Sequence, residues 1–255
     1  MASSENGLVE RAKCNALKTM KEAGFDVSDK LKVVIDPKLP FMGYSTKRNG
    51  RDIVVVSGMS LKSKMLEGLL IHEMSHIYRT STDHPSHDPA VLNKVASYVM
   101  QRSHLTRDYQ VAVVHQAINH IEDLYADDVA FQAFNQSGAF RLDQVYEFFL
   151  DWINEKPVRS KKAKTTWLNI GLMLNNCFVI SNMTRHGVLD VDNQAGNKVQ
   201  KFLSQTSERM KQGFVYFKDF MMNLQENVTE KEFEESLTDY LTRIAELANA
   251  RADQT

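Results

Sequence analysis

The spacing of two histidines, His72 and His76, constrains the fold of this chain more than any other feature of its sequence. They bound an H-E-x-x-H motif in which Glu73 follows the first histidine. Residues four apart lie one above the other on the same face of an α-helix. Two imidazoles stacked in this way can bind one zinc ion, with Zn–N distances of about 2.0–2.1 Å. The motif therefore predicts a helix that carries a Zn²⁺ site, with Glu73 as the base that takes a proton from a metal-bound water.

The residues before the motif support this helix. Residues 52–57 are rich in β-branched side chains and lie between Asn-Gly at 49–50 and Gly58, a pattern that predicts a strand. Ser60 can then cap a helix, because its hydroxyl can accept a bond from a backbone N–H of the first turn. Apolar residues recur from there at steps of three and four, at Leu61, Met65, Leu69, Ile71, Met74 and Ile77. The alternative is a surface helix with two exposed histidines.

A catalytic zinc site usually has three protein ligands and one open position. The acidic residues of segment 118–131 are the candidates for the third ligand. This segment has one apolar stripe and is expected to be helical. Its acids are Glu122, Asp123, Asp127 and Asp128.

The order of a strand, the H-E-x-x-H helix and a later acidic helix resembles the gluzincin-type zinc metallopeptidases. It is similar in particular to the archaeal minigluzincins and to the soluble core of the CAAX prenyl protease-type enzymes. The resemblance covers residues 32–135. It implies a zincin-like fold, a peptide or protein substrate, and hydrolysis of peptide bonds. It also implies a third ligand from an E-x-x-x-D pattern, in which the aspartate orients a ligand histidine.

The acidic segment fits that pattern in two registers. Glu122 keeps the usual glutamate ligand but has Ala126 four residues on, whereas Asp123 is followed by Asp127 at the required spacing. At about 100° per residue, Glu122 lies at the border of the apolar stripe and Asp123 nearly opposite it. Because a ligand must face the interior, we expect Glu122 to bind the metal, with Asp123 as the alternative. Asp127 is the expected partner of a ligand histidine.

Other polar residues near the motif have two interpretations. His84 and His87 lie in a polar segment with two prolines, residues 80–89, and are expected to be solvated turn residues; the alternative is that they visit the metal or a substrate. Tyr125 belongs to the apolar stripe and is expected to pack, although a phenol can also stabilise an oxyanion. His115 is expected to be a core or surface imidazole.

Composition excludes some classes of function. The 255-residue chain has a formal net charge of −1, which offers no broad electrostatic attraction to nucleic acid. Its most apolar run, residues 167–180, contains three asparagines and is shorter than the roughly 20 residues of a membrane span, so a buried helix is expected. Cys14 and Cys177 are expected to be free thiols in a reducing, cytoplasmic environment.

The periodicity predicts an α+β, mostly α chain. A small antiparallel or mixed sheet near the N-terminus would accompany the motif helix in a zincin-like domain, residues 1–138, followed by a helical part, residues 139–255. The predicted strands are 31–35, one around Tyr44, and 52–57, and Asn49-Gly50 favours a tight hairpin turn between the last two. The predicted helices outside the site are 7–23, 142–156, 164–183, 193–224 and 229–251, and Thr229 with Glu232 fits a capping box at the start of the last one. The alternative function is a helical binding or assembly protein with a structural, inactive or latent zinc site.

Overall fold

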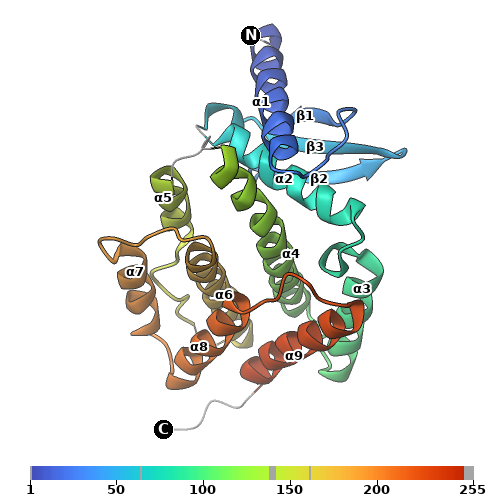
Figure 1. Cartoon of the computed structure of the whole chain (residues 1–255). Helices are drawn as coiled ribbons and strands as arrows, with labels where there is room; N and C mark the ends of the chain where they lie inside the picture. Colours follow the sequence, from blue (N-terminus) through green and yellow to red (C-terminus); the bar gives the residue numbers. More distant parts are fainter. Residues whose placement is uncertain (1, 64, 138–141, 161, 250–255) are drawn as a thin grey trace. The chain divides into compact units, whose positions relative to one another are not determined.

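The computed structural model describes residues 2–63, 65–137, 142–160 and 162–249 (Figure 1). Over these residues the chain forms nine α-helices and one three-stranded sheet near the N-terminus, which confirms the predicted α+β, mostly α class. Two compact units are present: residues 1–87 with 125–141, and residues 88–124 with 142–255. The predicted boundary between residues 138 and 139 lies outside the described residues. Helix α4 (Asp108–Ser137) belongs to both units.

The first unit contains the mixed sheet, whose strand order is β1-β3-β2. The central strand β3 (Arg51–Ser57) pairs parallel with β1 (Lys32–Asp36) and antiparallel with β2 (Gly43–Arg48). Asn49 and Gly50 connect β2 to β3 with φ angles of 50° and 73°, which confirms the expected tight hairpin. The β-branched run of β3 becomes the buried centre of the sheet, with Val54 and Val56 fully buried.

Helix α2 (Leu66–Ser81) carries the H-E-x-x-H motif and packs against α1 (Ala2–Glu22) and against β2 and β3. The sheet and helix approach closely at Gly43, where an added Cβ would lie 2.9 Å from the carbonyl oxygen of Val55 and 3.4 Å from the Leu69 side chain. Ser60 does not cap α2, contrary to the prediction. It begins the 3₁₀ turn Ser60–Lys62, and its hydroxyl donates to the Met42 carbonyl at 2.6 Å.

The second unit is helical. Its elements besides the first part of α4 are α3 (Pro89–Arg102), α5 (Leu142–Trp152), α6 (Ala163–Arg185), α7 (Gln194–Leu203), α8 (Glu208–Met222) and α9 (Glu230–Asn249). Helix α6 packs against α5, α7, α8 and α9, while α9 also packs against α3 and α8. The buried side chains of α6 occur on most of its turns, as expected for the apolar run 167–180. This helix is therefore the centre of the second core.

Two helix boundaries show how local chemistry sets the chain path. The single helix predicted over 193–224 is wrong, because α7 ends at Leu203 and α8 begins after Ser207, whose hydroxyl accepts a bond from the Met210 N–H at 3.3 Å. The capping box predicted before the last helix is confirmed. The Thr229 N–H donates to the Glu232 carboxylate at 2.9 Å, and the Glu232 N–H donates to Thr229 Oγ1 at 3.3 Å.

Candidate metal centre

The two motif histidines face each other across one turn of α2. Their rings lie 4.7 Å apart at an interplanar angle of 83°, and the two Nε2 atoms are 3.1 Å apart. The rest of the helix is anchored by buried apolar residues on the faces that meet α1 and the sheet: Leu66, Leu70, Ile71, Met74 and Ile77. Both histidines are half-buried, so the interpretation of α2 as a surface helix with two exposed histidines is wrong.

His72 is held by a carboxylate from α4. Its Nδ1 lies 2.7 Å from Asp127 Oδ1, and Asp127 is only 8% exposed. An ionised carboxylate can only accept a hydrogen bond, so Nδ1 carries the proton and Nε2 is left with its lone pair. This is the tautomer that a metal ligand needs, and an N–H directed to a carboxylate is the usual outer partner of a metal-bound histidine. The expected role of Asp127 as the partner of a ligand histidine therefore agrees with its position.

The third member of the cluster is Asp123. One ligand atom each from His72, His76 and Asp123 lies within 4.8 Å of the others, a grouping that could hold a metal ion. Asp123 lies one turn before Asp127 on the unbroken helix α4, so the two carboxylates share a helix face. Glu122, which helix phase favoured as the ligand, is not a member of this group.

His76 contacts a third histidine through its other ring nitrogen. Its Nδ1 lies 2.7 Å from Nε2 of His87, and the ring centroids are 4.9 Å apart. His87 is 7% exposed, so its expected role as a solvated turn residue is wrong. Burial, followed by the nearby charges of His76 and Arg79, lowers the pKa of His87 well below its usual value of 6.5. His87 is therefore a neutral, buried hydrogen-bond partner of His76 at neutral pH.

The end of α2 brings His87 back toward the helix. Asp83 adopts a left-handed conformation with φ 54°, the His84 N–H donates to the Arg79 carbonyl at 3.0 Å, and the Asp83 N–H donates to the Thr80 carbonyl at 3.3 Å. This pair of bonds is the Schellman pattern, which reverses the chain after a helix. A 3₁₀ turn then closes with the His87 N–H on the His84 carbonyl at 2.9 Å.

Two further buried residues join α2 to the second half of α4. The Arg79 Nε–H donates to the Tyr125 carbonyl at 2.9 Å, and its guanidinium lies 5.9 Å from the Tyr125 ring centroid. Tyr125 is 1% exposed, which supports its expected role in packing, and its ring lies 4.8 Å from that of His84. Glu73 is also buried, at 5% exposed, and is not part of the three-residue cluster.

The donor set fits a divalent metal that accepts nitrogen and oxygen ligands. Two nitrogens bound tetrahedrally to one Zn²⁺ at about 2.0–2.1 Å are about 3.3 Å apart, close to the observed 3.1 Å between the two Nε2 atoms. Two imidazoles and one carboxylate are a ligand combination found in catalytic zinc sites. The histidines and Asp123 can therefore hold a divalent metal ion.

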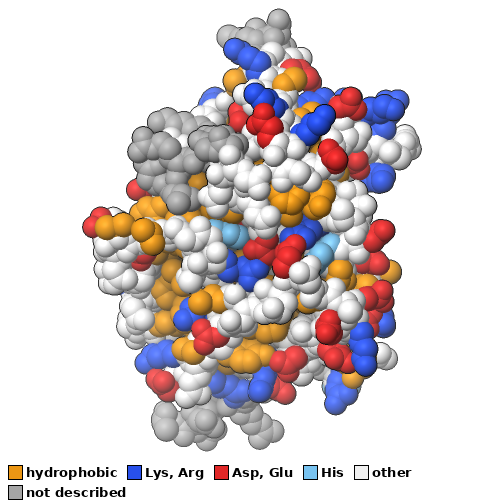
Figure 2. Space-filling model, viewed as in Figure 1, with side chains coloured by type: hydrophobic (Ala, Val, Ile, Leu, Met, Phe, Trp, Pro, Cys, Tyr) orange, Lys and Arg blue, Asp and Glu red, His pale blue; other side chains and the backbone are white. Residues whose placement is uncertain are grey.

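Other reactive side chains lie outside this cluster. His115 is exposed on α4, whereas His120 on the same helix is buried against Phe178. Cys14 is exposed and Cys177 is buried, and both are free thiols as expected. On the face shown in Figure 2, acidic and basic side chains are interspersed, in line with the net charge of −1.

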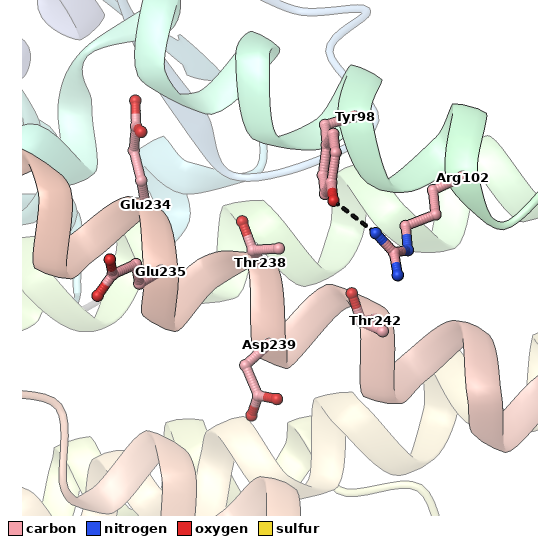
Figure 3. A pocket seen from close by; sticks show the side chains of 7 residues that line it. All are labelled: Tyr98, Arg102, Glu234, Glu235, Thr238, Asp239 and Thr242. Carbon is pink, nitrogen blue, oxygen red and sulfur yellow. Dashed lines mark hydrogen bonds between the residues drawn. The ribbon is translucent and has the colours of Figure 1, made fainter.

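A polar groove lies between α3 and α9 in the second unit (Figure 3). Its volume is about 450 Å³, and its lining residues are Tyr98, Arg102, Glu234, Glu235, Thr238, Asp239 and Thr242. The Arg102 guanidinium donates to the Tyr98 hydroxyl at 2.8 Å along one wall. No histidine or cysteine lines it, so its chemistry differs from that of the histidine cluster.

Comparison with known proteins places the chain in a family without assigning it an activity. A family model described as a family of unknown function, DUF5781, matches residues 15–246. The chain belongs to DUF5781. No curated protein and no solved structure matches this DUF5781 chain. Among the helices that the structure describes, none is both long and apolar enough to cross a lipid bilayer.

Proposed function

We propose that this chain is a zinc-dependent metallopeptidase in which His72, His76 and Asp123 bind the metal. The single observation that supports this proposal most strongly is the cluster of these three side chains beside the glutamate of an H-E-x-x-H helix. Asp123 takes the position that helix phase assigned to Glu122, and Asp127 orients His72. This is the register in which Asp123 and Asp127 are four residues apart.

The three-residue donor set favours a catalytic role over a purely structural one. Structural zinc sites are almost always closed by four protein ligands, whereas catalytic sites keep one position for water or substrate. Among the described residues, the cluster contains three. A zinc ion held there would supply Lewis acidity, which polarises a carbonyl and lowers the pKa of water toward neutrality.

Glu73 is the proposed general base and acid. Its position next to His72 on α2 suits a carboxylate that takes the proton of the attacking water and later gives it to the leaving amine. Its burial supports this role, because a carboxylate shielded from bulk water interacts more strongly with the reacting groups. A substitution to glutamine keeps the shape of Glu73 and removes its ability to accept the proton.

The edge of the sheet suits an extended peptide. Among the described strands, β2 is paired only with β3, so its other edge has backbone groups that a substrate strand can bond. Beside it, the Phe41 and Tyr44 rings lie 6.0 Å apart, and Phe41 is 52% exposed. We therefore propose a peptide or unfolded protein segment as the substrate.

Two measurements test this proposal. Zinc content determined by elemental analysis should be about one ion per chain in the wild type and in Glu73→Gln, while hydrolysis of a fluorogenic peptide library should be lost in Glu73→Gln. Equal hydrolysis by Glu73→Gln and the wild type would exclude the mechanism. The same analysis separates the two acids: Asp123→Asn should lose zinc and Glu122→Gln should keep it, with thermal melting as the check that both variants fold.

Chelation distinguishes the remaining alternative. If the protein is instead a helical binding or assembly protein with a structural zinc site, removal of zinc should unfold it. If the metallopeptidase proposal holds, a chelator should stop hydrolysis while circular dichroism shows that the helices persist. Loss of the helices on chelation would favour the structural alternative.

A further inference from the structure

A chain of hydrogen bonds runs from His76 into the turn that follows α2. His76 Nδ1 lies 2.7 Å from His87 Nε2, His87 Nδ1 lies 2.8 Å from Ser86 Oγ, and Ser86 Oγ lies 2.7 Å from His84 Nδ1. Ser86 is fully buried and His87 nearly so, which shields the central links from water. We refer to these four residues as the imidazole chain.

The hydrogen bonds at His84 determine which group donates and which accepts in the rest of the imidazole chain. The backbone N–H of Ser86 donates to His84 Nδ1 at 3.3 Å, so this nitrogen must hold a lone pair. The Ser86 hydroxyl must then donate its only proton to the same nitrogen. Its oxygen is left to accept a bond from Nδ1–H of His87.

The direction continues to the metal centre. Neutral His87 with its proton on Nδ1 has a lone pair on Nε2, which accepts a bond from Nδ1–H of His76. With its proton on Nδ1, His76 then has a lone pair on its own Nε2, the atom that lies 3.1 Å from Nε2 of His72. The bond to Asp127 leaves His72 Nε2 with a lone pair as well, so the two Nε2 atoms can bind one cation together.

We infer that His87 and Ser86 are positioning residues that hold His76 in the tautomer and orientation needed to bind a divalent cation. This inference rests on the proposed function, because it concerns the same metal centre. The two ligand histidines have different supports: His72 is oriented by an anionic carboxylate from α4, and His76 by a neutral imidazole from the turn after its own helix. The Schellman turn at Asp83 places His87 beside His76.

The tautomers can be measured on the metal-free protein. Long-range ¹H–¹⁵N correlation spectra of the histidine rings should show His76 and His87 protonated at Nδ1 and His84 protonated at Nε2. A His87 ring protonated at Nε2 would overturn the inference. Because this readout needs no metal, it decides the imidazole chain even if the wild type binds no zinc, a result that would refute the proposed function instead.

Zinc affinity provides the second readout. In competition with a chromogenic chelator, His87→Phe should bind Zn²⁺ about 10–100-fold more weakly than the wild type, as is usual when the outer partner of a ligand histidine is lost. His87→Gln should restore most of the affinity, because its amide oxygen can accept the same bond from His76. The control His115→Gln, at an exposed position on α4, should bind as the wild type does. Wild-type affinity in folded His87→Phe would overturn the inference.

Discussion

His120 is expected to make the folded protein sensitive to mild acid. The residue lies on α4 at 7% exposure, with its ring stacked on Phe178 at a centroid distance of 4.9 Å. Its Nδ1 is buried and has no hydrogen-bond partner among the residues that the structure describes. Burial lowers the pKa of His120 from 6.5 to about 4, against a smaller opposing effect of Asp123.

The size of the effect follows from this difference in pKa. Because the folded-state pKa lies below that of the unfolded chain, the unfolded chain binds the proton more tightly, and stability falls as the pH drops from about 6.5 toward 4. At 1.36 kcal/mol per pKa unit, the loss is about 1.4 kcal/mol near pH 5.5 and about 3 kcal/mol near pH 4. A typical domain has only about 5–15 kcal/mol of stability in total, so a loss of this size is measurable.

Urea unfolding followed by circular dichroism, near pH 7 and near pH 5.5, measures the loss. Between these two pH values, His120→Leu should lose about 1.2 kcal/mol less stability than the wild type, because a small part of the effect is already present at pH 7. His115→Gln, which removes an exposed imidazole from the same helix, should behave as the wild type does. Every sample contains a chelator, so that no bound metal affects the measured stability. Any contribution of His87 and the metal-binding residues is then the same in the wild type and the variants, and it cancels in the comparison. An equal loss in His120→Leu and the wild type would refute the reasoning.

Two other substitutions test the contacts that position the site. Asp127→Asn should weaken Zn²⁺ binding about 10–100-fold in chelator competition, because the ionised partner of His72 is lost; unchanged affinity would mean that this carboxylate does not support the ligand. Gly43→Ala should destabilise the protein by about 1–3 kcal/mol in urea unfolding, because its Cβ would lie 2.9 Å from the Val55 carbonyl oxygen. Gly7→Ala, in open space on α1, should instead stabilise the protein by about 0.5–1 kcal/mol. If both substitutions changed the free energy of unfolding in the same direction, the packing argument would be contradicted.

The sequence predicted those elements whose signals are local. The β-branched run of β3, the Asn-Gly hairpin and the Thr229 capping box each depend on neighbouring residues, and each is present in the structure. The prediction of a single helix over 193–224 was wrong because a local signal inside this range was not used. Its apolar pattern continues through the break, and only the capping preference of Ser207 indicates a new start.

The third ligand could not be chosen from helix phase. The phase argument assumes that a helix has one buried and one solvated face, but α4 is buried nearly all round at this level. Leu124, Tyr125, Ala126, Asp127 and Val129 are all buried. A face opposite the apolar stripe can therefore still face the interior, as Asp127 does, and the preference for Glu122 over Asp123 loses its basis.

The burial of His87 was not predicted, because the position of this residue depends on a single backbone conformation. Polar residues with two prolines usually indicate a solvated turn. Here a non-glycine residue, Asp83, adopts the left-handed conformation and turns the chain back onto α2. Aspartate tolerates this conformation better than most residues, so Thr82-Asp83 at the end of an apolar pattern was the available signal.

The close approach of α4 to α2 agrees with the proposal that an aspartate binds the metal. An aspartate is one methylene shorter, so its carboxylate reaches about 1.5 Å less far from the helix. The buried Arg79 side chain bonds directly to a backbone atom of α4, the Tyr125 carbonyl, at 2.9 Å, which requires the helix itself to lie near α2. Asp127, one turn after Asp123, also has a short side chain. Its 2.7 Å bond to His72 likewise requires α4 to lie near α2. A helix held this near leaves less space for a glutamate than for an aspartate, which supports the register in which Asp123 binds the metal and Asp127 orients its histidine.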